Sequence, residues 1–288
     1  MKLLTLNTHS LQEEGYPQKL EQFVSVIQKE KPDLIALQEV NQSVYAQLAK
    51  SELLQGWVSC PDGIRIGQDN HAAQTAFRLW KAGIDCSWTW ISAKIGYGIY
   101  DEGMALLCLN RKIAEVESFF ISSCQDYQNW KTRRVLGVRM KGCSHWFYTV
   151  HMGWWQDEEE PFLEQWKRLN MTLEQKKEAG AVWLLGDFNS PAEFRGQGYD
   201  CICQSGWQDT YQLAEQKDSG ITVEGCIDGW REFSQEQTMP KGMRMDGIWC
   251  SQKLPVKYSK VLFNGENEAK VSDHFGVLIE ADVDAERF

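Results

Sequence analysis

The chain contains 288 residues with 43% hydrophobic and 24% charged side chains, and its 30 Lys and Arg against 40 Asp and Glu give a formal net charge of −10. These proportions are typical of a soluble globular protein and exclude disordered, collagen-like and low-complexity classes. The negative charge disfavours an extended nucleic-acid partner and an anionic membrane surface. No apolar stretch approaches the roughly 20 residues needed to cross a bilayer. Without a visible repeat or linker, we expect one domain over residues 1–288.

The nine cysteines are scattered, and only Cys201 and Cys203 stand close together. No CxxC pair occurs, so neither a disulfide framework nor a zinc site is expected. The N-terminus turns polar at Thr5, after an apolar stretch too short for a signal peptide, which needs about 7–15 apolar residues. We therefore expect a cytoplasmic protein with reduced cysteines.

Apolar patterns in the first half of the chain predict three strands and one helix. Residues 2–6 have the pattern of a strand. An amphipathic helix is predicted by apolar residues at helical spacing: Leu20, Phe23, Val24 and Ile27. Pro32 interrupts that pattern. Buried strands are then expected at residues 34–37, directly before Gln38 and Glu39, and at residues 104–109.

The second half alternates in the same way. Strands are expected at residues 146–150, 181–185, 245–250 and 275–281. Pro161 stands at a helix start and Gly180 at its stop, with apolar residues between them at helical spacing: Phe162, Trp166, Leu169 and Leu173. Because strands outnumber helices and helices fall between strands, we expect a layered α/β or α+β domain.

Acidic and amide residues stand at the ends of predicted strands, where α/β proteins commonly place their sites. They are Asn7, Glu39, Asp187, Asn189, Asp246 and Asp273. Carboxylate and amide oxygens suit a hard divalent cation such as Mg²⁺, which also binds substrate phosphate. Two histidines join them, His151 after a predicted strand and His274 after Asp273. A carboxylate paired with an imidazole fixes its tautomer and stabilises its protonated form.

Six short motifs surround these residues in order along the chain. They read Leu-Asn-Thr at 6–8, Ala-Leu-Gln-Glu-Val at 36–40, Thr-Val-His at 149–151, Gly-Asp-Phe-Asn at 186–189, Arg-Met-Asp-Gly-Ile at 244–248 and Ser-Asp-His at 272–274. The ordered set resembles the endonuclease/exonuclease/phosphatase superfamily, which has the deoxyribonuclease-I-like fold. The resemblance implies a four-layer α/β (α+β) sandwich, in which two packed, mostly antiparallel β-sheets are flanked by helices. It also implies hydrolysis of a phosphate ester with Mg²⁺ or Mn²⁺.

The resemblance also implies roles for matching residues. Glu39 is the implied principal metal ligand, with Asn7 and Asp273 near the metal and the phosphate. Asp187 matches the residue that orients or deprotonates the attacking water. The chemistry agrees, because a cluster of acidic groups is repulsive until a cation is bound.

Further matching residues are implied to contact the phosphate. Asn189 matches a phosphate-binding amide, and His274, paired with Asp246, matches a group that contacts the phosphoryl oxygens. His151 matches a second phosphate-contacting histidine, for which Glu102 is the expected carboxylate partner. Imidazole and amide donors stabilise the charge that develops on phosphoryl oxygens during in-line attack by water.

Within the superfamily, the chain is similar to the bacterial maltose 6′-phosphate phosphatases, on local sequences at residues 94–97, 100–105, 129–134, 151–155 and 220–225. The substrate expected from this resemblance is a sugar phosphate such as maltose 6′-phosphate. Trp130, Trp154 and Trp155 stand in polar stretches beside the candidate site residues. Trp154 and Trp155 are candidates to stack on a glucose ring, and Asp157 is a candidate acceptor for sugar hydroxyls. Three basic residues are candidates to neutralise a phosphate: Lys131, Arg133 and Arg134.

Two alternatives stay open at this point. A metal-dependent nuclease of the same superfamily has the same core residues, although the sequence has no Lys/Arg-rich stripe for a nucleic-acid backbone. A non-catalytic binding module of the same fold would not need every site position filled. We therefore expect an enzyme whose partner is a small-molecule phosphate ester, without nucleic acid or membrane. The sequence does not define the oligomeric state.

Overall fold

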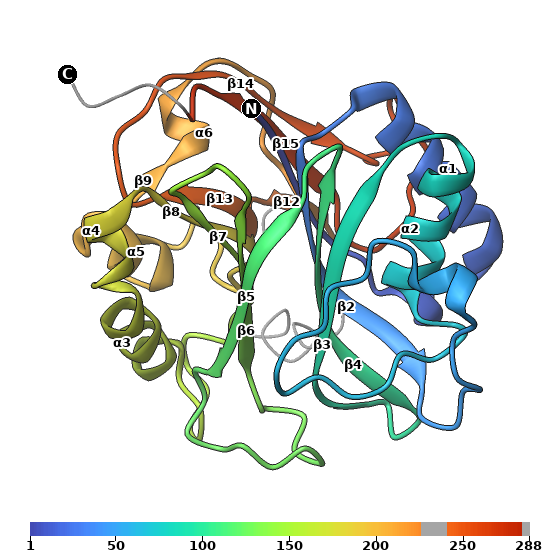
Figure 1. Cartoon of the computed structure of the whole chain (residues 1–288). Coiled ribbons are helices and arrows are strands. Elements are labelled where there is room, and N and C mark those ends of the chain that lie inside the picture. The colour runs from blue at the N-terminus through green and yellow to red at the C-terminus, as the bar shows by residue number, and fades with distance from the viewer. Residues whose placement is uncertain (226–240, 284–288) are drawn as a thin grey trace.

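Two β-sheets pack face to face, and helices cover the outer face of each sheet (Figure 1). The computed structural model describes residues 1–225 and 241–283. This architecture confirms the predicted four-layer α/β (α+β) sandwich. The helices on the two outer faces are α1 (Tyr16–Glu30) and α2 (His71–Lys81) on one side, and α3 (Phe162–Leu173), α4 (Lys176–Ala179) and α5 (Gly198–Gln204) on the other.

The first sheet has seven strands in the order β10-β14-β15-β1-β2-β4-β3. Its β1–β2 and β10–β14 pairs are parallel, and the remaining pairs are antiparallel. The strands are β1 (Lys2–Asn7), β2 (Leu34–Ser43), β3 (Cys86–Gly96), β4 (Tyr100–Leu109), β10 (Ala214–Lys217), β14 (Val256–Leu262) and β15 (Gly276–Ala281).

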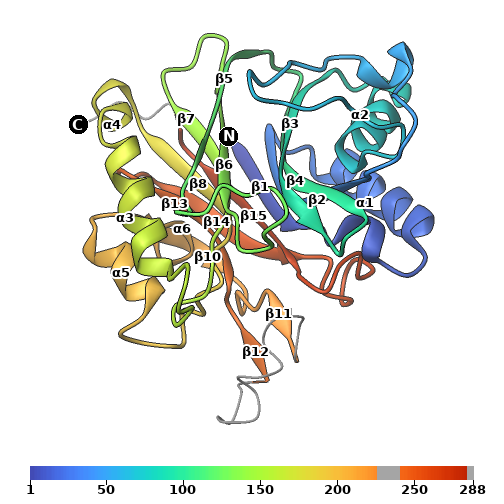
Figure 2. The ribbon, with the colours of Figure 1, turned by 90° about the horizontal axis from the view of Figure 1, so that it is seen from below.

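The second sheet has six strands in the order β5-β6-β7-β8-β13-β9, and only β7–β8 is parallel. Its strands are β5 (Ile113–Phe120), β6 (Arg134–Met140), β7 (Trp146–His151), β8 (Val182–Asp187), β9 (Gln208–Asp209) and β13 (Asp246–Cys250). A separate two-stranded pair, β11 (Val223–Glu224) with β12 (Gly242–Met243), extends away from the sandwich in the view from below (Figure 2). The short elements are η1 (Ser10–Gln12), η2 (Ser51–Leu54) and α6 (Thr210–Leu213).

The predicted strands and helices correspond to β1, β2, β4, β7, β8, β13 and β15, α1 and α3. The sequence analysis did not predict β3, β5, β6 or α2. Strand β3 is buried on both faces over nearly its whole length, so its sequence lacks the alternation that marks a half-buried strand. Strand β2 also continues to Ser43 instead of ending at Leu37.

Successive residues of a strand face opposite sides of the sheet. In β1, Leu4 and Leu6 belong to the core beneath α1 and α2, whereas Leu3 belongs to the core between the sheets. Thr5 and Asn7 follow Leu3 on that inner face and are buried. The inner face of β1 therefore changes from apolar to polar toward the end of the strand.

A buried glutamine joins the two sheets near this polar end. The Gln38 Nε2 atom donates to Thr149 Oγ1 of β7 at 2.8 Å and to Thr5 Oγ1 of β1 at 3.1 Å. Gln38 is fully buried, so each of these bonds satisfies a group that has no access to water. They hold the separation of the sheets at the end where the polar residues gather.

Other features follow the composition. The eight cysteines in residues 1–225 and 241–283 are free thiols. Several tryptophans fill the apolar layers, among them Trp88, Trp90, Trp166 and Trp183, which are almost fully buried. Among the helices in the described part of the chain, none is long and apolar enough to span a membrane.

We expect His71, at the start of α2, to make the free energy of unfolding depend on pH. Burial, reinforced by the positive charge of Arg78, lowers the pKa of His71 to about 3, so the folded state keeps this imidazole neutral and the unfolded state protonates it near pH 6.5. Its contribution is complete above that pH and is lost as the pH falls toward 3, by about 1.4 kcal/mol per pH unit.

The check is chemical denaturation of the wild type and of His71→Gln between pH 5 and 8. We expect the stability of the wild type relative to the variant to fall below about pH 6.5. His145→Asn is the control for removing an imidazole elsewhere in the chain. His145 is half-buried, and its Nδ1 atom accepts a hydrogen bond from the Ala181 backbone N–H at 2.8 Å. Parallel curves for the wild type and His71→Gln would contradict the prediction.

Candidate active site

Three neighbouring strands bring polar side chains together at one end of the inter-sheet core. Asp187, the last residue of β8, has His151 of β7 and Asp246 of β13 as its direct register partners. Paired residues project to the same face of a sheet. The side chain of Asn7 reaches this row from β1 in the opposite sheet, with its Nδ2 atom 3.1 Å from Asp187 Oδ2.

Glu39 reaches the same point through a β-bulge. In a regular strand it would share the face of Leu37, which packs beneath the helices. The β2–β4 register shifts just after Leu37, and Glu39 has φ 49°, so its side chain turns toward Asn7. The hydroxyls of Thr8 and Ser10 donate to the Glu39 carbonyl oxygen at 3.1 and 2.7 Å. Glu39 was expected at a strand end and lies instead within β2.

The amide of Asn7 links the two sheets. Its Nδ2 atom donates to Glu39 Oε1 at 2.9 Å and to Asp187 Oδ2 at 3.1 Å, and its Oδ1 atom accepts from the His9 backbone N–H at 3.3 Å. The hydroxyl of Ser272 donates to the backbone carbonyl of Asn7 at 2.8 Å. One nearly fully buried amide thus holds two carboxylates that come from different sheets.

His274 and Asp246 form a buried ion pair with 2.9 Å between Nδ1 and Oδ2. Thr222 supports the pair, because its hydroxyl accepts the backbone N–H groups of Met245 and Asp246 at 3.0 Å. Burial alone lowers the pKa of His274, but the carboxylates of Asp246 and Asp187 outweigh it and raise that pKa well above the usual range. His274 is therefore a cation in this cluster.

His151 has the opposite protonation state. Burial, together with the positive charges of Arg133, Lys94 and His274, lowers the pKa of His151 well below its usual range. Its Nε2 atom lies 3.7 Å from Asp187 Oδ2 and 4.0 Å from Glu39 Oε1. The site therefore contains one charged and one neutral imidazole.

Glu102 differs from its predicted role. It was expected to pair with His151, but its Oε1 atom lies 3.1 Å from Lys94 Nζ, and the carboxylates within ion-pair distance of His151 are those of Asp187 and Glu39. The reason is the pairing of β3 with β4, whose register sets Lys94 opposite Glu102. Glu102 still lines the pocket and acts on Glu39 through its charge.

The two central carboxylates, Glu39 and Asp187, both have a raised pKa. Burial, with the charges of Glu102 and Asp273 added, raises the pKa of Glu39 to about 7. Burial, with Asp246 added and His274 opposing, raises the pKa of Asp187 to about 6. Like charges held in a buried site favour binding of a cation.

The donors at this point fit a divalent metal ion. Glu39 and Asp273 supply carboxylate oxygen atoms, which are the ligands that Mg²⁺ and Mn²⁺ accept, and Asn7 is the third predicted ligand. Asp187, Asp246 and His274 also place one potential ligand atom each within 4.8 Å of one another. Asn7 points its nitrogen at the carboxylates, so it would turn its amide to offer oxygen to a metal.

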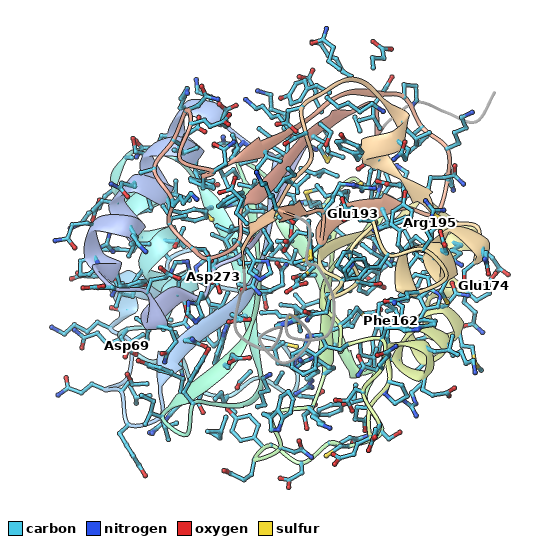
Figure 3. The ribbon with its side chains drawn as sticks, turned by 180° about the vertical axis from the view of Figure 1, so that it is seen from behind. Asp69, Phe162, Glu174, Glu193, Arg195 and Asp273 are labelled. Carbon is cyan, nitrogen blue, oxygen red and sulfur yellow. The ribbon has the colours of Figure 1, made fainter. Side chains whose placement is uncertain are left out.

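A pocket of about 370 Å³ opens over this cluster. Asp273 lies near the middle of the molecule, between the sides marked by Asp69 and Phe162 (Figure 3). From the predicted site, the structure brings into the pocket wall Glu39, Glu102, Arg133, His151, Trp154, Asp187, Asn189, Asp273 and His274. Asn7 and Asp246 lie behind it, bonded to Asp187 and His274.

Asn189 lies in the wall directly after β8. Its φ of 44° is in the left-handed region, and its backbone N–H donates to Asp187 Oδ1 at 2.8 Å. The side-chain Nδ2 atom donates to the carbonyl oxygen of Met152 at 2.8 Å. Asn189 therefore orients the Asp187 carboxylate in addition to lining the pocket.

Four residues expected to bind substrate do not line the pocket: Trp155, Arg134, Lys131 and Asp157. Trp155 packs against Phe162 of α3, with 6.0 Å between ring centroids. The Arg134 guanidinium bonds Asp62 and Ser118, each at 2.9 Å. Successive residues of an extended chain point to opposite sides, which separates Arg134 from Arg133.

Lys131 and Asp157 form an ion pair with each other outside the pocket wall. Lys131 Nζ lies 3.0 Å from Asp157, and the Asp157 carboxylate also accepts backbone N–H groups from residues 159 and 160. The candidate sugar-binding role of Asp157 is therefore replaced by a structural one: it caps a turn and holds the lysine.

Five pocket residues were not predicted as site residues: His9, Lys94, Ile95, Gly96 and Tyr97. Trp130, noted from the sequence only as lying beside the candidate site residues, also lines the pocket. His9 is fixed by Glu13, with 2.7 Å between Nδ1 and Oε1, and its Nε2 atom lies 3.1 Å from the Tyr97 hydroxyl. Its position two residues after Asn7 was the available signal. Lys94, Tyr97 and Trp130 belong to local sequences that carried the narrower resemblance, but their sequence did not indicate which side chains face the pocket.

The profile of the Endonuclease/Exonuclease/phosphatase family matches residues 4–274. An endonuclease/exonuclease/phosphatase family protein from Leptotrichia buccalis C-1013-b is 31% identical to this chain. The match covers 98% of this chain and 99% of that chain, and the two structures superpose with a TM-score of 0.83. No curated protein matches the chain. The chain belongs to the Endonuclease/Exonuclease/phosphatase family, a superfamily of metal-dependent phosphoesterases and nucleases.

Two other solved structures have the same fold at lower identity. A mannosyl-6-phosphatase from Bacteroides thetaiotaomicron VPI-5482 is 16% identical, with 98% of this chain and 99% of that chain covered and a TM-score of 0.65. A 3′-5′ exonuclease from Neisseria meningitidis is 19% identical, with 98% and 100% covered and a TM-score of 0.61. One is a phosphatase and the other a nuclease, so the fold does not choose between these activities.

Replacing a central site residue is expected to abolish most of the turnover. For Asp187→Ala, Glu39→Ala and His274→Ala we expect kcat to fall by about 10³-fold or more, because each variant removes a group from one coupled cluster. The measurement is steady-state phosphate release. The control is Asp209→Asn, at a buried carboxylate that bonds Arg244 and Tyr199 outside the pocket. Near-normal turnover in any of the three alanine variants would contradict the assignment.

Proposed function

We propose that this protein is a cytoplasmic, Mg²⁺-dependent phosphomonoesterase that hydrolyses a sugar phosphate, such as maltose 6′-phosphate, to the free sugar and phosphate. The observation that carries the proposal is the pocket itself. It combines an acidic and imidazole cluster at its base with indole and phenol rings in its walls. The base suits phosphate-ester hydrolysis and the walls suit a saccharide.

Glu39, Asp273 and Asn7 are the residues that would hold Mg²⁺, or Mn²⁺ in its place. Two observations support this assignment. The carboxylates of Glu39 and Asp273 are oxygen donors, and burial together with the charges of Glu102 and Asp273 raises the pKa of Glu39 to about 7. When bound, the cation neutralises negative charge on the phosphoryl oxygens. It also relieves the repulsion within the acidic cluster.

In the proposed mechanism, Asp187 orients the attacking water. Its Oδ1 atom accepts from the backbone N–H of Asn189 at 2.8 Å and its Oδ2 atom accepts from Asn7 at 3.1 Å, so the carboxylate has a fixed orientation. The water oxygen bonds to phosphorus while the bond from phosphorus to the ester oxygen breaks. Asp187 accepts the proton that the water loses, and the ester oxygen takes a proton from solvent to leave as the sugar hydroxyl.

His274 is proposed to bind a phosphoryl oxygen. Asp246 occupies its Nδ1 atom and keeps the ring positively charged, which leaves Nε2 to donate. His151 and Asn189 line the same part of the pocket, and Arg133 brings a nearly fully buried guanidinium to it. Preorganised donors of this kind stabilise the transition state without reorganisation.

The size and charge of the pocket favour a small monoester over a nucleic acid. Its volume of about 370 Å³ falls in the range of small-molecule sites, roughly 300–1,000 Å³. Its lysine and arginine residues are Lys94 and Arg133, whereas binding along a nucleic-acid backbone needs many phosphate contacts. The family includes nucleases, so a metal-dependent endo- or exonuclease is the alternative activity.

The direct test is phosphate release with Mg²⁺ from maltose 6′-phosphate and glucose 6-phosphate, beside nicking and shortening of a DNA duplex. We expect release from the sugar phosphates, no DNA cleavage, and loss of activity with EDTA that excess Mg²⁺ restores. DNA cleavage without sugar-phosphate hydrolysis would replace the proposal by the nuclease alternative.

Metal binding has a readout that does not need the substrate. Mg²⁺ should raise the melting temperature of the wild type by a few degrees, because it binds the folded state alone. Glu39→Gln should abolish that rise and, without metal, melt no lower than the wild type, since it removes a partly buried negative charge beside Asp273 and Glu102. Glu21→Gln, at an exposed glutamate of α1 that bonds Arg78, is the control. An unchanged Mg²⁺ response in Glu39→Gln would remove this residue from the metal site.

A further inference from the structure

The segment of residues 121–133 connects strands β5 and β6 of the six-stranded sheet but bonds to the other sheet. The Ile95 backbone N–H of β3 donates to the Tyr127 carbonyl oxygen at 2.8 Å. The Tyr127 hydroxyl donates to Asp101 Oδ1 of β4 at 2.6 Å. Lys94 Nζ donates to the Trp130 carbonyl oxygen at 2.7 Å. We call residues 121–133 the bridging segment, because it joins the two sheets beside the pocket.

The Trp130 carbonyl oxygen accepts hydrogen bonds from the lysine and the arginine of the pocket wall. Lys94 donates to it at 2.7 Å, and Arg133 Nη1 donates to it at 3.1 Å. Lys94, Trp130 and Arg133 all line the pocket, so these two bonds make that part of the wall continuous. The position of residue 130 is therefore coupled to the position of the guanidinium.

The Arg133 guanidinium is buried, with one of its donors unpaired in the described part of the chain. It is only 5% exposed, and its Nε atom has no hydrogen-bond partner within residues 1–225 and 241–283. A buried guanidinium with an unpaired donor is costly unless an anion joins it. Arg133 lines the pocket wall, and the negative charges of Glu102, Glu39 and Asp187 act on its guanidinium.

The Trp130 side chain is held but not buried. The Trp130 ring centroid lies 5.3 Å from that of Trp154, and Lys131 Nζ lies 5.4 Å from the Trp130 centroid. Asp157 in turn fixes Lys131 at 3.0 Å. Trp130 nevertheless remains 49% exposed. A supported indole that is half open to solvent can pack against the apolar C–H face of a pyranose ring.

We propose that Trp130 is the specificity-determining residue of this enzyme and binds the sugar ring of a phosphorylated saccharide. Lys94 and Arg133 fix its distance from the phosphoryl group through the Trp130 carbonyl. This inference rests on the proposed phosphomonoesterase function. It adds a physical basis for selecting saccharide phosphates over phosphate esters that have no ring.

The test compares Trp130→Ala with Trp80→Ala on two substrates. Trp80 of α2 is a matched control, because it is 48% exposed, packs against one other ring, that of Phe77, and lies outside the pocket. Maltose 6′-phosphate offers the sugar ring, and glycerol 1-phosphate offers a primary phosphate ester without one. Melting curves establish that both variants are folded.

For Trp130→Ala we expect KM for maltose 6′-phosphate to rise about tenfold, the size of one good contact, with kcat unchanged. We expect kcat/KM for glycerol 1-phosphate to change less than twofold. Trp130→Tyr should recover most of the loss, because it restores an aromatic face, and Trp80→Ala should match the wild type on both substrates.

The failures of the two proposals are distinguishable. A wild type that releases no phosphate from either ester overturns the proposed function and the inference that rests on it. A wild type that hydrolyses both, with a Trp130→Ala variant that keeps the wild-type KM for maltose 6′-phosphate or loses both activities equally, overturns the specificity role alone.

Discussion

The arrangement of the site depends on one buried amide. Asn7 Nδ2 donates to Glu39 of its own sheet and to Asp187 of the facing sheet. Two acidic side chains can approach in a buried space only where donors or cations separate their charges. The amide adds no charge, and its hydrogen bonds lower the pKa of both carboxylates, but burial outweighs them and raises the pKa of Glu39 to about 7 and that of Asp187 to about 6. The cluster is thereby kept receptive to a cation and to a proton.

The strand pattern and the motifs were sufficient to predict the base of the site. Asp187 ends a strand whose inner row is otherwise apolar, and Asn7 ends a strand whose inner row turns polar at Thr5. Asp246 is the register partner of Asp187, so two-residue periodicity and sheet pairing account for most of this cluster. Glu39 was harder to predict, because periodicity alone puts it beneath the helices. Only the local bulge, recorded as φ 49°, returns it to the inner side.

The walls were predicted less well, for a reason that adjacent residues make clear. Arg133 lines the pocket and Arg134 does not, and Trp154 lines it while Trp155 packs beside Phe162. The two residues of each pair are of the same type, so only the path of the backbone determines which one faces the pocket. That path is set by long-range bonds, such as Ile95 to Tyr127, which no local pattern encodes. Under the proposed function, the loops at the pocket wall would determine specificity, whereas the strand ends hold most of the acidic cluster.

The hydroxyls of Thr8 and Ser10 both donate to the carbonyl oxygen of Glu39, and Ser10 also accepts the backbone N–H of Asn41. The turn after β1 and the bulge in β2 are thus one structural module built from two distant pieces of sequence. In a chimaera between relatives, residues 7–10 and 38–41 have to be exchanged together. A graft of either piece alone would keep the acidic residue in the sequence while changing the direction in which it points.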